Sequence, residues 1–220
     1  MSSESPRIPL LSCLYQEYLD NHDSDEFSRR VSQSYSQGTI ERLAEHDSRP
    51  IRRAAVLALG FLGDYQANHV MGRALNDEDR TVRILAEDGI RNVWKRVGSE
   101  DQRRELNVII RLNSAKHFEE ASRRATELAE KAPWFAEAWN QRAIAHFALS
   151  RYAESIRDCH QTREMNPYHI AAASGMGQAY LELDNHVSAL ECFRRALRLN
   201  PNLENVRVQV TRLTRMIEGK

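Results

Sequence analysis

Residues 133–166 read PWFAEAWNQRAIAHFALSRYAESIRDCHQTREMN, and residues 167–200 read PYHIAAASGMGQAYLELDNHVSALECFRRALRLN. Both segments begin with proline, and Pro201 follows at the same interval. A fixed period in this range, about 34 residues, is typical of a stack of helical hairpins. The positions that correspond across the two segments are Trp139 and Ala173, Ala143 and Gly177, His146 and Tyr180, Ser155 and Ala189, and Cys159 and Phe193.

The same period extends back to residue 102, so that residues 102–203 contain three units of helix, turn and helix. This region resembles the tetratricopeptide repeat (TPR), because small and large side chains fall in register across the units. The resemblance implies an α–α superhelix whose first helices form a concave surface that binds extended peptides. The residues that carry it in the third unit are Gly177, Tyr180, Ala189, Phe193, Ala196 and Pro201.

A second repeat, of different length, lies in residues 39–98. Ile51-Arg52 matches Val82-Arg83, and other apolar positions match at the same interval. Each unit is predicted as a short helix, an Asp-bearing turn and a longer Ala/Leu-rich helix, with the longer helices at 50–62 and 81–97. The stretch resembles two HEAT-like repeats, on the basis of residues 51–55, 58–60, 62–64 and 81–83.

The remaining segments complete an all-α solenoid. Residues 1–8 are expected to be disordered, residues 9–38 to form an N-terminal helical pair, and residues 204–220 to form a helix that caps the array. The prediction is thus an all-α protein, an α–α superhelix built from HEAT-like and TPR helical hairpins.

Composition indicates a cytoplasmic protein. Lys and Arg together number 31, equal to Asp and Glu, so no general attraction to nucleic acid or to an anionic membrane is implied. The three cysteines, Cys13, Cys159 and Cys192, form no CxxC pair and suit a reducing compartment. No apolar run is long enough to span a bilayer. We expect no cofactor, and a homo-oligomer is possible.

The TPR resemblance implies a partner-binding face on the first helices of the three units. The amides among these residues suit hydrogen bonds to a peptide main chain, and the apolar ones would provide a hydrophobic seat. A solvated face that binds nothing specific is the alternative. The candidate residues are Arg103, Asn107, Asn140, Gln141, Ile144, Phe147, Ser174 and Gln178.

One known TPR function is disfavoured by the same resemblance. Family members that clamp acidic chaperone tails need lysine, arginine and asparagine in the groove. The corresponding positions here are Leu106, Ile110, Ala171 and Gly175. A carboxylate clamp, and with it a co-chaperone role, is therefore not expected.

The first hypothesis is therefore a non-enzymatic scaffold that binds another protein, because no catalytic or metal-binding constellation occurs in the sequence. A second hypothesis follows from the HEAT-like resemblance: a chromophore-lyase-like protein that holds a small molecule. A third is contact with a nucleic-acid backbone through Arg52, Arg53 and Arg83. The simpler interpretation of these arginines is bonding to Asp47, Asp77 and Asp79 in the adjacent turns.

Overall fold

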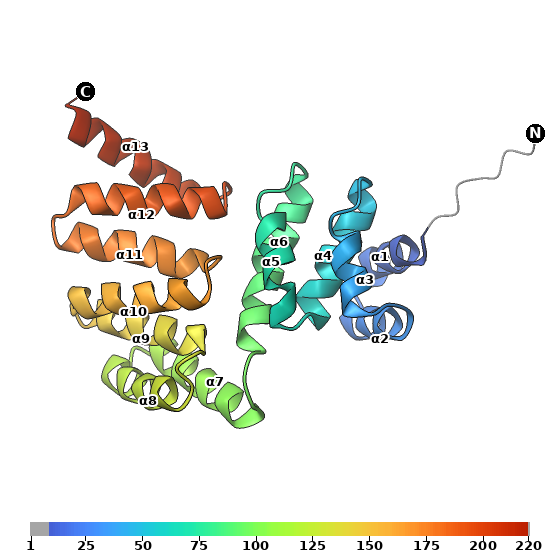
Figure 1. The fold of residues 1–220 in the computed structure, drawn as a ribbon, viewed down its shortest axis with the longest axis horizontal. Coiled ribbons are helices and arrows are strands. Elements are labelled where there is room, and N and C mark those ends of the chain that lie inside the picture. Colours follow the sequence, from blue (N-terminus) through green and yellow to red (C-terminus); the bar gives the residue numbers. More distant parts are fainter. Residues whose placement is uncertain (1–8, 220) are drawn as a thin grey trace, which may run out of the picture. The chain divides into compact units, whose positions relative to one another are not determined.

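The computed structural model describes residues 9–219, which fold as helices joined by short turns (Figure 1). The expected disorder of residues 1–8 lies outside the described residues. The chain forms two compact units, one up to Trp94 and the other from Lys95. Within residues 9–219 there is no β-strand, so the all-α prediction is confirmed.

The first unit contains α1 (Leu10–Asn21), α2 (Ser24–Ser34), α3 (Gln37–Leu43), α4 (Arg49–Leu62), a 3-10 turn (Tyr65–Ala67), α5 (Asn68–Ala74) and α6 (Arg80–Lys95). The short and long helices of residues 39–98 are thus present, although α6 ends at Lys95 rather than at the expected residue 97. Both α1 and α2 pack against α4. The N-terminal pair is therefore part of the same compact unit as the helices that follow it.

The long helices α4 and α6 approach closely at a pair of glycines. A Cβ atom on Gly60 would lie 2.9 Å from the Cα atom of Gly89, and one on Gly89 would lie 2.7 Å from the Cα atom of Gly60. Neither position has room for a side chain, so the two backbones pack directly on each other. The Cε atom of Met71, on α5, fills the adjacent space.

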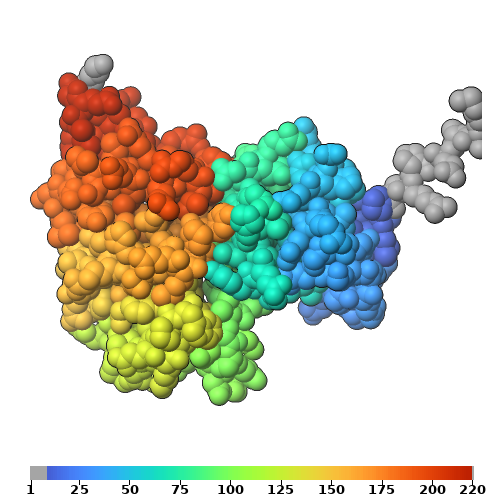
Figure 2. Space-filling model, viewed as in Figure 1, coloured from blue at the N-terminus to red at the C-terminus, as the bar shows by residue number. Residues whose placement is uncertain are grey.

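The second unit contains α7 (Glu100–Ser114), α8 (Phe118–Lys131), α9 (Ala136–Ala148), α10 (Tyr152–Met165), α11 (Ile170–Glu182), α12 (His186–Leu199) and α13 (Glu204–Glu218). Each helix contacts the next one in the chain, and α9 also contacts α7 and α11. Consecutive helices therefore follow one another through this unit in sequence order, as the colours of Figure 2 show. This stacking of hairpins is the arrangement that the recurring prolines and their period predict.

The backbone repeats the same turn three times in this unit. Lys116, Ser150 and Asp184 occupy corresponding positions in the three repeats, and their φ angles are all positive, at 64°, 59° and 55°. The backbone N–H that follows each of them donates to a carbonyl five residues earlier, as in His117 to Leu112 at 2.9 Å. This pattern is the Schellman motif, which satisfies the last carbonyls of a helix and reverses the chain.

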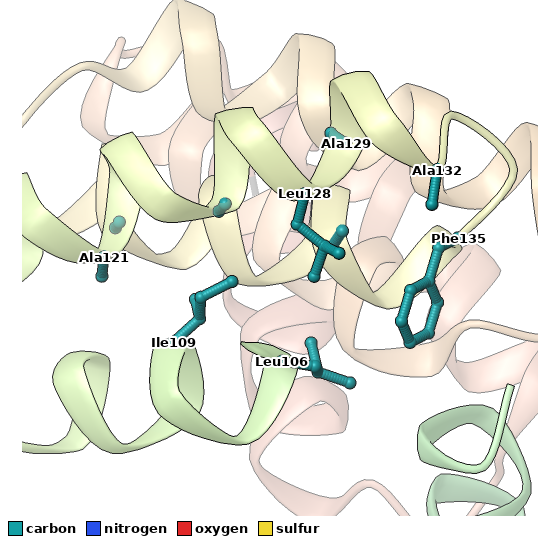
Figure 3. Close-up of a cluster of buried hydrophobic side chains, with 10 residues drawn as sticks. Leu106, Ile109, Ala121, Leu128, Ala129, Ala132 and Phe135 are labelled. Atoms are coloured by element: carbon teal, nitrogen blue, oxygen red, sulfur yellow. The ribbon is translucent and has the colours of Figure 1, made fainter. Parts of the chain in front are cut away.

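Small and apolar side chains fill the space between the helices of each hairpin. In the first repeat, Leu106 and Ile109 of α7 point toward Ala121 and Leu128 of α8, and Phe135 closes the end of the cluster (Figure 3). All five are buried. Burying a side chain of this size stabilises the fold by about 1.5–3 kcal/mol for Leu, Ile or Phe, so the hairpins are held mainly by these contacts.

Side chains of different size pair at corresponding positions of the second and third repeats. Gly177 faces the ring of Phe193, and a Cβ atom on Gly177 would lie 2.7 Å from that ring. The corresponding residues one repeat earlier are Ala143 and Cys159, a larger residue beside a smaller one. The space that Gly177 leaves on α11 is thus filled by the large ring of Phe193, whereas Ala143 faces a smaller side chain one repeat earlier.

Candidate functional site

The first helices of the three repeats, α7, α9 and α11, form the candidate partner-binding surface, which we call the first-helix face. Ile144 is its most evident feature, because this apolar side chain is 43% exposed. Asn107 and Gln178 are exposed as well, and Phe147 is partly buried beside the ring of Tyr152, with ring centroids 5.5 Å apart. The face therefore offers an apolar centre with an amide on the helix to either side.

The side-chain amides of two predicted contact residues, Asn140 and Gln141, form hydrogen bonds inside the protein. Asn140 and Gln141 are buried, and their side-chain N–H groups donate to Glu137 Oε1 at 3.0 and 2.9 Å. Gln141 also accepts hydrogen bonds from Asn113, whose Nδ2 lies 3.0 Å from its Oε1. Because these amides already bind other side chains, they are not available for the main chain of a peptide, and they hold the repeats together instead.

The other predicted residues lie at the edges of the face. Arg103 is half-buried, and its guanidinium donates to the carbonyl oxygens of Gly98 and Arg96 in the preceding loop. The hydroxyl of Ser174 donates to the carbonyl of Ile170 at 3.1 Å. Arg103 therefore fixes the start of α7, while Ser174 offers only a small polar surface.

The sequence alone did not predict a buried pair of a carboxylate and an imidazole in this unit. Glu137 of α9 lies 3.0 Å from His169, which precedes α11, and both are buried. Burial acts to raise the pKa of Glu137, but hydrogen bonds from His169, Gln141 and Asn140 outweigh it and lower the pKa. An isolated acid in an alanine-rich helix was the available signal, since the corresponding positions of the neighbouring repeats hold Arg103 and Ala171.

Ser122, His146 and Asp158 lie in the order of a nucleophile, base and orienting acid. Ser122 Oγ is 3.0 Å from His146 Nε2, and His146 Nδ1 is 3.1 Å from Asp158 Oδ2. However, Ser122 is buried inside α8, whose backbone N–H groups bond within the helix and cannot stabilise an oxyanion. Arg142 also binds Asp158, at 2.9 and 2.7 Å. The cluster therefore ties α8, α9 and α10 together rather than forming a reactive centre.

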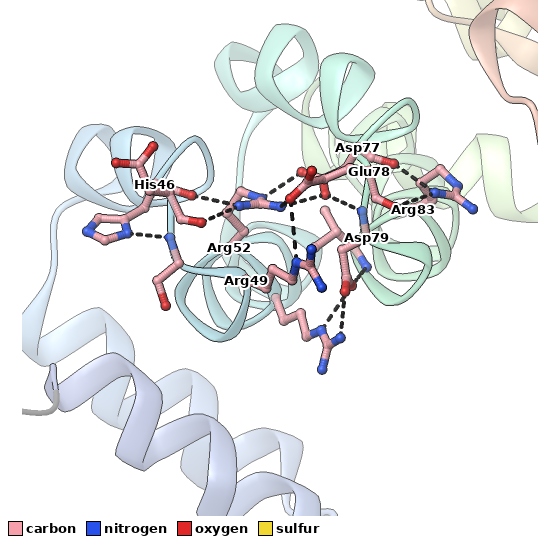
Figure 4. Close-up of polar contacts among 11 residues, drawn as sticks. His46, Arg49, Arg52, Asp77, Glu78, Asp79 and Arg83 are labelled. Carbon is pink, nitrogen blue, oxygen red and sulfur yellow. Dashed lines mark hydrogen bonds and ion pairs between the residues drawn. The ribbon is translucent and has the colours of Figure 1, made fainter.

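Two of the three arginines considered for nucleic-acid contact, Arg52 and Arg53, pair with acids of their own unit (Figure 4). Arg52 donates to both carboxylate oxygens of Asp77, at 2.7 and 2.9 Å, and Arg53 binds Asp79 in the same way at 2.9 and 2.6 Å. Such paired contacts fix the geometry of both partners. The simpler interpretation of these arginines is thus the one that the contacts support.

Arg52 and Arg83 are equivalent in structure as well as in sequence. Arg52 donates to the carbonyls of His46 and Asp47, and Arg83 donates to those of Asp77 and Glu78 (Figure 4). In both cases the acceptors lie six and five residues earlier, so each arginine holds the turn that precedes its own helix. The repeated arginine therefore makes the same hydrogen bonds to the preceding turn in both units.

Within residues 9–219, no group of histidine, cysteine and acidic side chains is placed to hold a metal ion. Over the same range no helix combines the length and the apolar character needed to cross a bilayer.

Residues 134–202 match the family model described as tetratricopeptide repeat. This stretch is therefore made of TPR units, as its period predicts. The HEAT-like resemblance of residues 39–98 stays a prediction.

Two curated proteins and one solved structure illustrate the similarity. A TPR repeat-containing protein of Rhizobium etli is 26% identical over 147 residues, which cover 65% of this chain and 69% of that protein. The Hsp70-Hsp90 organizing protein of Triticum aestivum is 29% identical over 94 residues, which are 43% of this chain but only 16% of that protein. The structure of the first TPR of Spaghetti superposes with a TM-score of 0.53 at 21% identity, over 56% of this chain and 97% of the other.

Proposed function

We propose that this chain is a non-enzymatic adaptor that binds an extended segment of a partner protein on the first-helix face. The observation that carries the proposal is the exposure of Ile144 on the middle one of three stacked helical hairpins. Because Ile144 lies one helical turn from the partly buried ring of Phe147, the two side chains together give a partner an apolar surface to cover.

The chemistry of the face favours a neutral or apolar segment. Ile144 and Phe147 provide the apolar seat, and the amides of Asn107 and Gln178 are exposed and able to bond to a peptide main chain. The solved TPR of Spaghetti is described as bound to an HSP90 peptide, SRMEEVD. That acidic sequence is not the ligand we propose for this face, because Ala171 and Gly175 of α11 stand where a carboxylate clamp needs polar or basic side chains.

The alternatives have less support. Arg52, Arg53 and Arg83 bind carboxylates and carbonyls within their own unit, which removes the basis for a nucleic-acid backbone contact there. No contact among the described residues favours a chromophore-lyase-like role. Binding of a partner protein is therefore the function that the contacts of this chain favour.

A peptide-display selection on the full chain tests the proposal. Selected peptides should bind in fluorescence polarisation, and Ile144→Glu should weaken them by about tenfold, because it places an uncompensated charge in the apolar seat. Val187→Glu is the matched control, since Val187 is 59% exposed but lies at the start of α12, away from the first-helix face. If the selected peptides bind Ile144→Glu as tightly as the parent chain, their binding site is not the first-helix face, and the proposal is wrong.

A further inference from the structure

A groove of about 520 Å³ lies between α10 and α12, with α11 as its floor. Met176 and Tyr180 of α11 line the bottom, and Cys192 of α12 lines one wall. On an α-helix, residues two apart differ by about 200° in direction. Met176 and Tyr180 therefore point to the opposite side of α11 from Ser174 and Gln178, and this groove is separate from the first-helix face.

Arginines dominate the rim of this groove. Arg163 comes from α10, and Arg194, Arg195 and Arg198 come from α12, against a single acid, Glu191. Within residues 9–219, neither Arg163 nor Arg195 has a carboxylate within ion-pair distance. Many of the other arginines of the unit have one, as Arg142 has in Asp158.

Arg163 is held in a position that lacks a counter-ion. Its Nε is buried without a hydrogen-bond partner, and its Nη1 lies 3.8 Å from the sulfur of Met176. Burial, together with the positive charge of Arg195, lowers the pKa of Arg163. A partly desolvated guanidinium of this kind is costly for the protein alone and would be stabilised by an anion.

We propose that the groove between α10 and α12 binds a doubly charged anionic group on a partner protein, either the phosphate of a phosphorylated side chain or two neighbouring carboxylates. Guanidinium groups bind both kinds of oxygen pair through two parallel hydrogen bonds. The groove has the volume of a small-ligand pocket, and its apolar lining of Met176, Tyr180 and Cys192 suits the apolar part of the same side chain. A duplex would need a longer basic track than this one groove provides.

Calorimetry on the full chain at low salt tests the proposal with four probes: pyrophosphate, a short peptide carrying one phosphoserine, the same peptide with two adjacent glutamates instead, and its neutral form. We expect pyrophosphate and at least one charged peptide to bind, the neutral peptide not to bind, and added salt to weaken binding. Whichever charged peptide binds more tightly identifies the source of the anion.

Variants locate the site. Arg195→Gln changes an exposed side chain and should weaken binding by about tenfold, and adding Arg163→Met, which keeps the apolar stem, should weaken it further. Arg157→Gln is the control, because this exposed arginine of α10 instead pairs with Glu154, at 3.6 Å. Ile144→Glu should not change anion binding, so the proposal for this groove and the proposal for the first-helix face are tested separately.

Three results would overturn the proposal. The first is no binding of any charged probe at low salt. The second is equal binding by Arg195→Gln and Arg157→Gln. The third is a DNA duplex that binds more tightly than both charged peptides and loses its binding in Arg195→Gln.

Discussion

His169 Nε2 lies 3.0 Å from Glu137 Oε2 and connects the hairpin of α9 and α10 to the hairpin of α11 and α12. The backbone N–H of Ala172 donates to His169 Nδ1 at 3.1 Å, so Nδ1 carries no proton. The proton must therefore be on Nε2, which donates to the carboxylate. Asn140 and Gln141 donate to the other oxygen of Glu137, so every polar contact of this buried acid is an accepted hydrogen bond.

Glu137→Gln should destabilise the second unit by about 2–3 kcal/mol, although it preserves the shape of the side chain. An amide places its N–H₂ either against the N–H of His169 or against the donors of Asn140 and Gln141, so one group loses its acceptor. Urea unfolding at neutral pH, followed by tryptophan fluorescence, to which Trp134 and Trp139 of this unit both contribute, measures the change. Glu130→Gln, an exposed substitution on α8, should change the free energy of unfolding by less than about 0.5 kcal/mol.

The difference between parent and Glu137→Gln should depend on pH. Because folding lowers the pKa of Glu137 below its ordinary value of 4.5, the carboxylate stabilises the fold fully above that value and progressively less as pH falls through the folded-state pKa. Unfolding curves recorded at descending pH should therefore converge in the acid range. A difference that stays constant from neutral pH to the acid limit would show that the charge of Glu137 contributes nothing.

Arg52→Gln should destabilise the first unit by about 3 kcal/mol, because the substitution leaves Asp77 and the carbonyls of His46 and Asp47 without their buried donor. Trp94, the one tryptophan of this unit, reports its unfolding. Arg49→Gln is the matched control, because the Arg49 side chain is 63% exposed and its 3.5 Å contact with Glu78 contributes less than about 1 kcal/mol. Equal effects of the two substitutions would contradict the role assigned to Arg52.

The sequence predicts the architecture well because its two periods reflect contacts that every unit repeats. The match of Arg52 with Arg83 is an example: the same side chain holds the same turn twice. Pro133, Pro167 and Pro201 likewise each stand three positions before a helix, namely α9, α11 and α13. Such features are visible in one chain because each is present more than once.

Features that occur in a single repeat are less accessible to the same reasoning. Periodicity places Asn140 and Gln141 on a first helix, but it does not reveal that Glu137 turns both amides inward. The groove depends on two helices, α10 and α12, that are not consecutive in the chain, and on Arg163 and Arg195 having no carboxylate within ion-pair distance among the described residues. In both cases the outcome depends on which side chains lie nearby in space, and the spacing of residues along the sequence does not show this.

Ser150→Gly should stabilise the second unit by about 0.5–1 kcal/mol, because Ser150 lies in the left-handed region that costs a residue with a Cβ atom about 1–2 kcal/mol. Its φ angle is 59°. Glycine adopts this conformation freely but loses more entropy on folding, so part of the gain is offset. Thermal unfolding should show a higher Tm, whereas Ser114→Gly, at the end of α7, should lower it.

Gly177→Ala should destabilise the third repeat by about 1–3 kcal/mol, although alanine is the better helix former. The added methyl group would lie within 2.8 Å of two ring atoms of Phe193, and the close packing of α11 against α12 leaves the ring little room to move. Phe193→Leu in the same chain should recover part of the loss, because alanine with leucine occupies about the combined volume of glycine with phenylalanine. A double-mutant cycle followed by urea unfolding measures this coupling. Additive effects of the two substitutions would show that Gly177 and Phe193 do not constrain each other.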